Sequence, residues 1–596
     1  MVGPRRTPSN IFDPDLVIVG GNVLTVDDAF SKAEAVAIKD GRIIAVGSSA
    51  EIRPLIGQKT QVLDLKGKTI LPGIIDHHIH GFLWGITQPP LALDLDRSKV
   101  GSVKNILDLV REEAAALEPG DGIFGFGLDP EAVAEMAGGQ PSRLSRQDLD
   151  TASPKNPVLL QDFQRNFLWA NSKALHLAGI SAETTDLMGA IVHKDPTDGQ
   201  PTGFLEVPRF VDFVLIGSLL PPMTYQQRRE GILACLKALN AYGITSVVEP
   251  GLGVGIGYFC RGVHETENLR VLSDLHREGL LKMRITALLF SQDFLAPGVA
   301  SLEGLKKYLD YVGTNTGFGD EWLRIGGLKM LVDFAHFNKT AWMYEDYVGG
   351  GNGMLLVKGE TDEERCRELA EMIKYGHSKR WQIAIHAIGD RTTDACVDGF
   401  IKAQQEDPWD DARHYLIHVN FVRPETMKRM AENRIGASIQ SAWKWWYMYS
   451  DLDEPAVGPE RNAKSIPMRS LLDAGVKVAN GSDAPETDPD WKIGVMAAVT
   501  RRSKLTGRVG GPEECVSVEE AIRSYTIDAA YLDHQDQVKG SIETGKYADF
   551  CILGDDVLSA DPEAIPDIPV LMTIVGGRVV YDADSGEINL TTDRTE

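Results

Sequence analysis

The stretch that decides the fold runs from Leu71 to His80 and reads Leu-Pro-Gly-Ile-Ile-Asp-His-His-Ile-His. Its β-branched centre predicts a short buried strand that ends in a His-x-His motif. Successive strand side chains point to opposite faces, so His78 and His80 share one face while His77 points to the other. Two imidazoles side by side at a strand end can bind one divalent metal ion. Taken alone, such a motif is more often a surface histidine cluster.

Length and composition limit the classes of protein to consider. The chain has 596 residues and a formal net charge of -24. It is longer than one ordinary domain, and its acidity argues against a nucleic-acid backbone or an anionic membrane as partner. No apolar run reaches the roughly 18 residues of a membrane span, and no apolar stretch follows the basic N-terminus as in a secretory signal.

The cysteines indicate the compartment. The chain has six, none in a Cys-x-x-Cys pair, which predicts reduced thiols in a cytoplasmic protein. They are Cys235, Cys260, Cys366, Cys396, Cys515 and Cys551.

Both ends of the chain carry strand-like runs interrupted by turn signals. These runs are Asp15–Thr25, Ala33–Gly47, Ala548–Leu553 and Val570–Tyr581. Neither end has enough strands to bury a core alone, since isolated hairpins are only marginally stable. We therefore expect residues 1–70 and 535–596 to form one composite β-sandwich, in preference to two independent hairpins.

Between the two ends, strands alternate with helices. Capping boxes open two expected helices, at Thr361 with Glu364 and at Ser517 with Glu520. Repeated β-α units predict a parallel sheet, either closed as a barrel or open and doubly wound. A dinucleotide-binding fold loses support because no Gly-x-Gly-x-x-Gly fingerprint opens a helix after a first strand. The expected strands are Trp381–Ala387, His414–Phe421, Gly436–Gln440 and Val476–Asn480.

Polar groups follow several of these strands. His386 and His418 end apolar runs, and Asp483 lies just past another. Each residue taken singly is more often a satisfied core or strand-end group than a ligand. Their order along the chain is the argument, because His-x-His, His, His and Asp each fall at a different strand end, where a barrel places its chemistry.

At this point the sequence resembles the amidohydrolase superfamily, and within it the branch that includes N-substituted formamide deformylases. The matching motifs are L-P-G-x-I-D-x-H-x-H at Leu71–His80, W-x-N-S-x-A-L at Trp169–Leu175, G-x-P-T-G at Gly199–Gly203, H-A-x-G-D at His386–Asp390, G-S-D at Gly481–Asp483 and G-K-Y-A-D at Gly545–Asp549. The resemblance implies an α/β fold: a (β/α)8 TIM-like barrel over residues 71–534, with an insertion at about 85–220, beside the composite β-sandwich.

The resemblance also implies a metal site with one or two divalent ions, Zn²⁺ by preference. The family carries His-x-His on barrel strand 1, a lysine on strand 4 that is commonly carboxylated, a histidine on strands 5 and 6, and an aspartate on strand 8. The corresponding residues are His78, His80, Lys329, His386, His418 and Asp483. Phe334 replaces the glycine of the family pattern after the lysine. Asp483 is the expected general base and acid.

Other residues are expected to support the site. Ligating histidines usually need a partner for the second ring nitrogen, and the candidates are Asp76, Asp390 and Asn420. For Asp390, helix capping is an equally weighted alternative. Arg165 is a candidate for binding a substrate carboxylate, although a solvated charge is the simpler interpretation.

The substrate pocket is expected to be aromatic. Relatives show Q-P-x-H after strand 7 and often a histidine at position 166, where this chain has Gln440 to Trp443 and Asn166. The alternative is that the aromatic residues only pack loops together. The residues predicted to line the pocket are Phe82, Trp84, Asn166, Trp342, Gln440 and Trp443.

These observations predict a metal-dependent hydrolase that cleaves an amide or N-acyl C–N bond of an aromatic or hydrophobic small molecule. One alternative is a non-hydrolytic reaction on the same barrel, such as decarboxylation or isomerisation. Another is a catalytically inactive binding or scaffold protein. We expect a small-molecule substrate, with no nucleic acid and no membrane as partner. The resemblance also suggests a homodimer, since members of this branch often form dimers, but no sequence feature demonstrates it.

Overall fold

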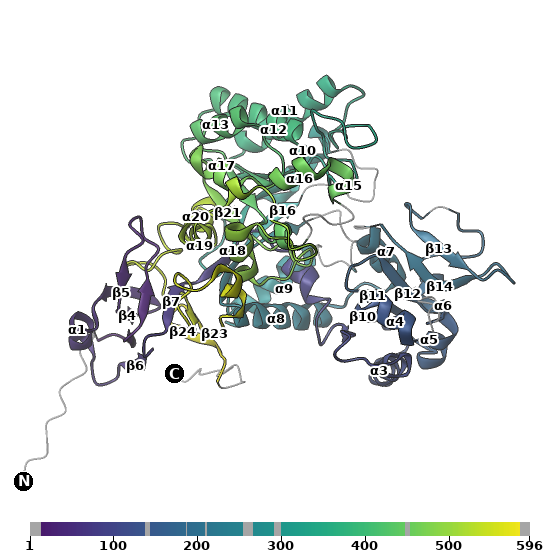
Figure 1. Ribbon diagram of the computed structural model, residues 1–596, viewed down its shortest axis with the longest axis horizontal. Helices are drawn as coiled ribbons and strands as arrows, with labels where there is room; N and C mark the ends of the chain where they lie inside the picture. The colour runs from purple at the N-terminus through teal and green to yellow at the C-terminus, as the bar shows by residue number, and fades with distance from the viewer. Residues whose placement is uncertain are drawn as a thin grey trace, which may run out of the picture.

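Eight short parallel strands form the centre of the molecule in the computed structural model (Figure 1). The model describes residues 13–136, 144–185, 187–208, 211–253, 261, 266–290, 300–446 and 453–584, so Cys260 lies outside the described residues. In sheet order the strands are β8 (Ile74–Asp76), β15 (Ile244–Leu252), β16 (Arg284–Phe290), β17 (Leu323–Leu331), β18 (Ile383–Ala387), β19 (Tyr415–His418), β20 (Gly436–Ile439) and β21 (Val478–Asn480).

The first and last of these strands approach one another and nearly close the sheet. The backbone N–H of His77 donates to the carbonyl of Asn480 at 3.1 Å, and that of Asp483 donates to the carbonyl of His78 at 2.7 Å. Since the strands are parallel and alternate with helices, this is the geometry of a β/α barrel. The predicted α/β barrel is therefore confirmed.

Helices between the strands form the outer layer of the barrel, as Figure 1 shows for the upper part of the molecule. Two predicted capping boxes open helices, because Thr361 caps α11 and Ser517 caps α19. The principal helices are α8 (Tyr225–Ala241), α9 (Thr266–Arg277), α10 (Leu302–Val312), α11 (Asp362–Ser378), α12 (Asp390–Glu406), α13 (Pro424–Glu432), α17 (Met468–Asp473), α18 (Trp491–Thr500), α19 (Val518–Ser524) and α20 (Ile527–Leu532).

The segment from Leu71 to His80 joins two parts of the fold. Its first residues end strand β7 (Thr69–Pro72), which pairs with β22 outside the barrel, and the following strand β8 begins the barrel. Gly73 lies between them, where a Cβ atom would come within 2.1 Å of Oγ1 of Thr245. Only glycine fits this close approach without displacing its neighbour.

Strands from both ends of the chain share one sheet, so that purple and yellow strands lie side by side at the left of Figure 1. This sheet has the order β24-β23-β22-β7-β2-β3, and a second sheet has the order β5-β4-β1-β6. The new strands are β1 (Leu16–Val19), β2 (Asn22–Leu24), β3 (Lys32–Ala33), β4 (Ala35–Lys39), β5 (Arg42–Gly47), β6 (Gln61–Asp64), β22 (Phe550–Leu553), β23 (Val570–Val575) and β24 (Arg578–Asp582).

Hydrophobic side chains from the two sheets pack together, among them Ile18, Ile38 and Phe550. The expected hairpin at Asp40 is present, because β4 and β5 pair directly across it. The expected run from Asp15 to Thr25 is divided at Gly20, whose φ of 64° is in the left-handed region. Strands β1 and β2 consequently enter different sheets.

Residues from about 85 to 220 include a folded α/β unit, seen at the right of Figure 1. Its mixed sheet has the order β13-β14-β12-β11-β10-β9, and it has hydrophobic clusters of its own. Its elements include β9 (Leu93–Asp94), α3 (Val103–Ala116), β10 (Ile123–Leu128), α5 (Arg146–Ala152), β11 (Val158–Asp162), β12 (Phe167–Ala170), α6 (Ser172–Leu177), β13 (Ile191–Lys194), β14 (Pro201–Glu206) and α7 (Val211–Leu219).

The W-x-N-S motif of this insertion has a structural role. Trp169 is buried in β12, and the side chain of Asn171 accepts a hydrogen bond from the N–H of Ala174 at the start of α6. The same oxygen accepts from the N–H of Val158. The motif therefore joins a helix start to a neighbouring strand.

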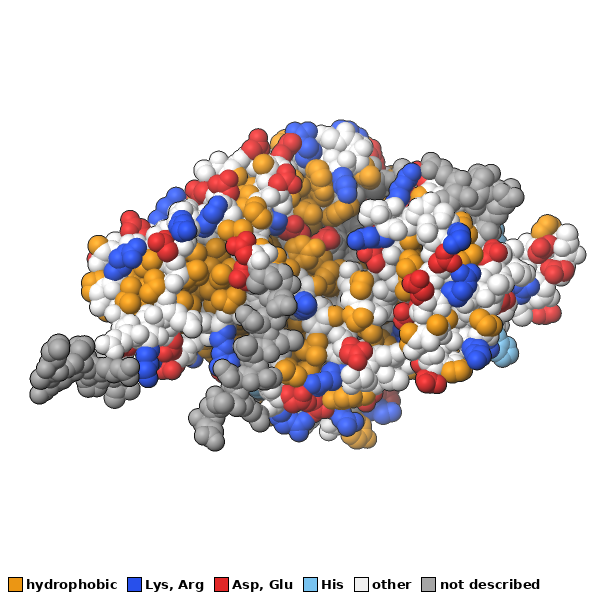
Figure 2. Space-filling model, turned by 90° about the horizontal axis from the view of Figure 1, so that it is seen from below, with side chains coloured by type: hydrophobic (Ala, Val, Ile, Leu, Met, Phe, Trp, Pro, Cys, Tyr) orange, Lys and Arg blue, Asp and Glu red, His pale blue; other side chains and the backbone are white. Residues whose placement is uncertain are grey.

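The surface has a mixed character. On the face seen from below, acidic and basic side chains are interspersed, and hydrophobic side chains gather over part of it (Figure 2). Among the described residues, the helices are too short or too polar to cross a bilayer.

Candidate metal centre

The carboxyl ends of the barrel strands bring the predicted donor residues to one place. His78 and His80 directly follow β8, His418 ends β19, and Asp483 follows β21. Lys329 and His386 lie within β17 and β18, near their carboxyl ends. All six side chains line one cavity, so the fold gathers residues that are far apart in sequence.

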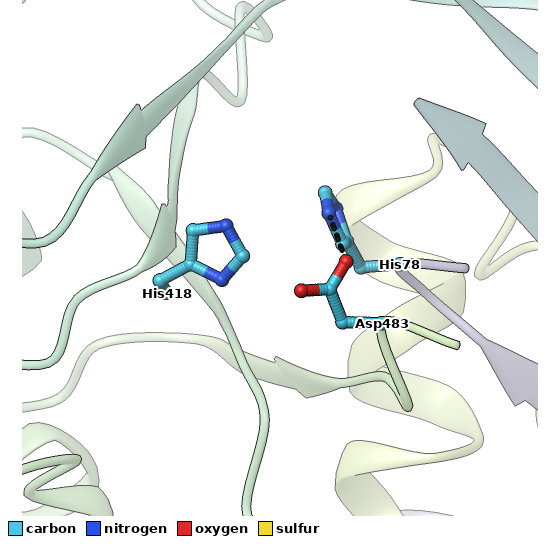
Figure 3. Close-up of side chains that lie close together, drawn as sticks. All are labelled: His78, His418 and Asp483. Atoms are coloured by element: carbon cyan, nitrogen blue, oxygen red, sulfur yellow. Dashed lines mark ion pairs between the residues drawn. The ribbon is translucent and has the colours of Figure 1, made fainter. Parts of the chain in front are cut away.

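Three of these side chains form a compact cluster, which Figure 3 shows. One donor atom from each of His78, His418 and Asp483 lies within 4.8 Å of the others. Nε2 of His78 is 3.2 Å from Oδ1 of Asp483, and Nε2 of His80 is 3.5 Å from the same oxygen. Two imidazoles and a carboxylate converging on one point are a donor set typical of a zinc site.

The other two candidates flank this cluster. The ring of His386 is 4.3 Å from the ring of His418, centroid to centroid. Lys329 is 4% exposed, and burial lowers the pKa of its ammonium group to about 7. A lysine with a lowered pKa is more often neutral and nucleophilic, as carboxylation requires.

The buried histidines are in the state that binds metal. Burial lowers the pKa of His78, His386 and His418 well below the usual value, so these rings are neutral. Both ring nitrogens of His78, and Nε2 of His386, have no hydrogen-bond partner among the described residues. Buried polar atoms are rarely left unpaired, and a divalent cation would satisfy these nitrogens. The residues present therefore fit a metal ion.

Asp76 supports the backbone of the site and does not contact an imidazole. Its Oδ1 accepts hydrogen bonds from the N–H groups of His78, at 3.2 Å, and Ser482, at 3.0 Å. Burial raises the pKa of Asp76 to about 7. Asp76 thus connects the first barrel strand to the segment after the last, across the closing edge.

Gln440 has the supporting role that was predicted for Asn420. Its Oε1 lies 2.6 Å from Nδ1 of His418. The side chain of Asn420 instead points to His336, with 3.5 Å between Nδ2 and Nδ1. His418 and Val419 have φ of 77° and 46°, and this left-handed backbone turns the chain after β19 away from its strand direction.

Asp390 belongs to a helix start and not to a metal-ligand pair. Its Oδ1 accepts from the N–H groups of Tyr344 and Arg391, and it is the first residue of α12. The equally weighted alternative, helix capping by Asp390, is also wrong, because Gly389 is the N-cap of α12 and no side chain caps it.

Two carboxylates near the histidines were not predicted. Asp333 lies 3.9 Å from Nε2 of His386 and accepts from the N–H of Gly389 at 2.9 Å. Glu249 lies 4.0 Å from Nδ1 of His80, and burial raises the pKa of its carboxyl group to about 8. The signal that could have found them is their position at, or just beyond, the carboxyl end of an apolar strand.

An apolar cavity of about 440 Å³ opens over these side chains. Its apolar wall comes from both the insertion and the barrel. It includes Leu83, Met188, Val211, Phe213, Val214, Phe290, Leu331, Phe334, Phe337 and Trp443. Helix α7 contributes three of these residues, so the insertion forms part of the pocket.

Of the residues predicted for the pocket, Trp443 lines this cavity, and its ring stacks on His418 at 5.0 Å between centroids. Phe82, Trp84 and Trp342 are instead buried in the main hydrophobic core. The first two lie on the short helix α2 (Gly81–Gly85), which packs against α8. The remaining two, Asn166 and Gln440, are also absent from the lining.

Arg165 is neither solvated nor open to a substrate carboxylate. It is 3% exposed, and its guanidinium group donates to Asp212 at 2.9 Å and to Glu486 at 2.6 Å. Asp212 belongs to α7, and Glu486 follows the last barrel strand. Arg165 thus joins the insertion to the barrel beside the cavity.

A parallel β/α barrel with this donor set at its carboxyl ends defines a hydrolase of the metal-dependent barrel class. The chain belongs to the amidohydrolase family, whose model matches residues 61–581. A solved structure of an uncharacterized metal-dependent hydrolase from Pyrococcus furiosus is similar, with a TM-score of 0.69 and 25% identity, covering 91% of this chain and 100% of that one.

Two relatives are similar over nearly the whole chain. Protein LONG AFTER FAR-RED 3 of Arabidopsis thaliana is 28% identical over 585 residues, covering 96% of this chain and 93% of that protein. N-substituted formamide deformylase of Arthrobacter pascens is 27% identical over 583 residues, covering 95% of this chain and 98% of that protein.

Proposed function

We propose that this protein is a metal-dependent hydrolase that cleaves an amide or N-acyl C–N bond in a small molecule with an apolar or aromatic body. The observation that carries the proposal is the convergence of His78, His418 and Asp483 beneath a predominantly apolar cavity. The family supports hydrolysis, and one relative is named as a deformylase of N-substituted formamides, which contain such a bond.

The candidate ligands are His78, His80, His386, His418 and Asp483, with Lys329 beside them. One or two divalent ions held there, Zn²⁺ by preference, would lower the pKa of a water molecule to about 7 and polarise a carbonyl group. We propose that Lys329 is carboxylated. Its burial and lowered pKa support this modification, which a mass increase of one CO₂ under native conditions would detect.

Asp483 is placed to move the proton. Its Oδ1 lies among the imidazole nitrogens that face the cavity, 3.2 Å from His78 and 3.5 Å from His80. From there the carboxylate takes a proton from the attacking water and returns it to the departing amine. Asp483 has a φ of 54°, so its backbone is held in a left-handed conformation that directs the carboxylate to the histidines.

The apolar wall has two effects. It binds the hydrophobic part of a substrate, since burying apolar surface is favourable by roughly 25 cal/mol per Å². It also limits water around the reacting bond, which strengthens electrostatic interactions within the site. The aromatic side chains Phe213, Phe334 and Trp443 favour an aromatic substrate.

The proposal is tested on full-length protein purified without chelator. Metal content is measured first, and a panel of N-aryl and N-benzyl amides is then analysed for release of the amine and the acid. Asp483→Asn should abolish release while some metal stays bound. The matched control is Asp528→Asn, which alters a buried carboxylate paired with Lys477 outside the cavity.

Each alternative function predicts a different result in these measurements. Protein without bound metal would favour a binding or scaffold protein. Bound metal with conversion that releases no amine would favour decarboxylation or isomerisation. An active Asp483→Asn variant would contradict the role of Asp483. A cytoplasmic location is part of the proposal, and the five described cysteines, all free, support it.

A further inference from the structure

The cavity wall contains a polar pair besides the candidate ligands. Nε2 of His336 lies 3.1 Å from Oδ1 of Asp453, and both residues line the cavity. His336 follows strand β17, and Asp453 begins the short helix α15 (Asp453–Val457). They are 4% and 8% exposed, so the pair is set into the wall of the pocket.

The imidazole of His336 is held from several sides. Nε2 faces Asp453, and Nδ1 lies 3.5 Å from Nδ2 of Asn420. The rings of Phe421 and Phe337 meet it edge-on, at 5.4 Å and 5.8 Å between centroids. With Nε2–H donating to Asp453 and Nδ1 accepting from Asn420, one tautomer and one ring orientation are favoured.

The surroundings make this pair costly to bury. Next to His336 in sequence, the lining consists of the apolar Phe334, Ala335 and Phe337 and the polar Asn338. Ile388 and Trp443 also face the cavity. Polar groups in an apolar environment lose favourable hydration unless they are well paired. One purpose is structural, because the pair joins α15 to the segment after β17. A second role, in ligand binding, is suggested by the position of both side chains on the cavity surface.

We infer that His336 and Asp453 are the substrate-recognition pair of this cavity, and that Asp453 accepts a hydrogen bond from a hydroxyl or amine group on an otherwise apolar or aromatic substrate. The inference rests on the proposed function and specifies its substrate. A carboxylate has about four acceptor positions on its two oxygens, so the contact with His336 does not by itself use all of them. His336 orients the carboxylate and is a positioning residue.

The expected selectivity follows from pairing. A hydroxyl group that reaches Asp453 makes a hydrogen bond to a charged group, whereas a methyl group of similar size covers the carboxylate without a donor. We expect the hydroxylated ligand to bind about tenfold more tightly. A purely apolar pocket would show the opposite order, because it favours the methyl group.

The test measures binding without turnover. Isothermal titration calorimetry compares 4-hydroxyacetophenone with 4-methylacetophenone, and the 3-hydroxy with the 3-methyl isomer, on the metal-loaded full-length protein. These ketones contain no C–N bond to hydrolyse. Wild type should prefer at least one hydroxylated ligand about tenfold over its methyl partner. Equal binding, a preference for the methyl ligands, or no binding of any of the four would overturn the inference.

Variants test whether the preference for hydroxylated ligands depends on Asp453. Asp453→Leu should remove it, and Asp453→Asn, which keeps the volume and a neutral acceptor, should reduce it several-fold. The matched control is His276→Gln, since His276 pairs with Asp320 at 2.7 Å outside this cavity and its loss should leave the preference unchanged. Melting temperatures are recorded for all three. A preference retained in both Asp453 variants, with only a lowered melting temperature, would assign the pair to structure and overturn the inference.

The two proposals fail separately. If wild type shows the ligand preference but releases no amine from any amide, the recognition pair stands and the hydrolase proposal fails. If amides are hydrolysed but the ketones show no preference, the hydrolase proposal stands and the recognition pair fails.

Discussion

Oε1 of Gln440 lies 2.6 Å from Nδ1 of His418. This contact determines which nitrogen of the ring is available, because Nδ1–H donates to the amide oxygen and the lone pair of Nε2 is left for a metal. The indole of Trp443 stacks on the same imidazole, with an interplanar angle of 16°. Gln440 and Trp443, which both follow β20, thus orient the candidate ligand His418 at the end of the neighbouring strand β19.

Removing the Gln440 contact should weaken metal binding. In Gln440→Leu, the ring of His418 loses the partner that selects its tautomer, and we expect metal affinity to fall about 10- to 100-fold. Competition with a chromophoric chelator measures the affinity. Gln405→Leu changes an exposed glutamine on α12 and should leave it unaltered. Equal affinities in the two variants would contradict the orienting role.

Metal removal should lower stability, because it leaves buried nitrogens of His78 and His386 without a partner. A ligand present at about 100 times its Kd stabilises the folded state by about 2.7 kcal/mol. We therefore expect chelation to lower the melting temperature and added Zn²⁺ to restore it, as followed by calorimetry. His78→Ala should abolish this response, whereas a zinc-dependent shift of wild-type size in that variant would show that the ion binds elsewhere.

Truncating Trp443 should weaken substrate binding. The half-buried indole contributes apolar surface to the cavity and stacks on His418, an arrangement worth about 1 kcal/mol. We expect kcat/KM for an N-aryl amide to fall about fivefold or more in Trp443→Ala, with a smaller loss for an aliphatic amide. Steady-state kinetics with both substrates measure the difference. Trp322→Ala, in a groove beside the β-sandwich, is the control.

Breaking the Arg165 bridge should be strongly destabilising. Arg165→Met leaves the carboxylates of Asp212 and Glu486 buried without their shared cation, a change that costs about 3–5 kcal/mol in comparable buried pairs. Urea unfolding measures this loss. Arg229→Met removes a more exposed pair with Glu278 and should cost about 1 kcal/mol or less. A similar small loss for both would mean that the bridge does not hold the insertion to the barrel.

Much of the fold could be predicted from the sequence because its signals are local. Alternating strands and capped helices indicated a parallel β/α sheet, and the family resemblance indicated its closure as a barrel. The turn residues Asp40 and Gly41 marked a hairpin that is present. Five of the six candidate ligands could be named for the same reason, since they end or follow apolar runs and parallel strands end at one face. Lys329 was named from the family resemblance alone. Their roles as ligands stay predictions, although the structure brings them together.

The partners of these residues could not be predicted, because they depend on backbone direction and on packing between distant segments. Asn420 and Gln440 both follow short strands, but the left-handed backbone at His418 and Val419 turns Asn420 toward His336. Trp84 was predicted to line the pocket because it lies close in sequence to the His-x-His motif. The packing of α2 on α8 instead places it in the core.

The sequence by itself determined the order of strands and helices and the residues at strand ends. Hydrophobic periodicity and turn preferences depend only on residues that are close together in the sequence. Only the tertiary structure decided which side chains face the cavity. Its wall joins α7 of the insertion to the segments after β17 and β21, and Arg165 holds these parts together through Asp212 and Glu486. Such contacts arise from the closing of the barrel and the docking of the insertion, which no local pattern encodes.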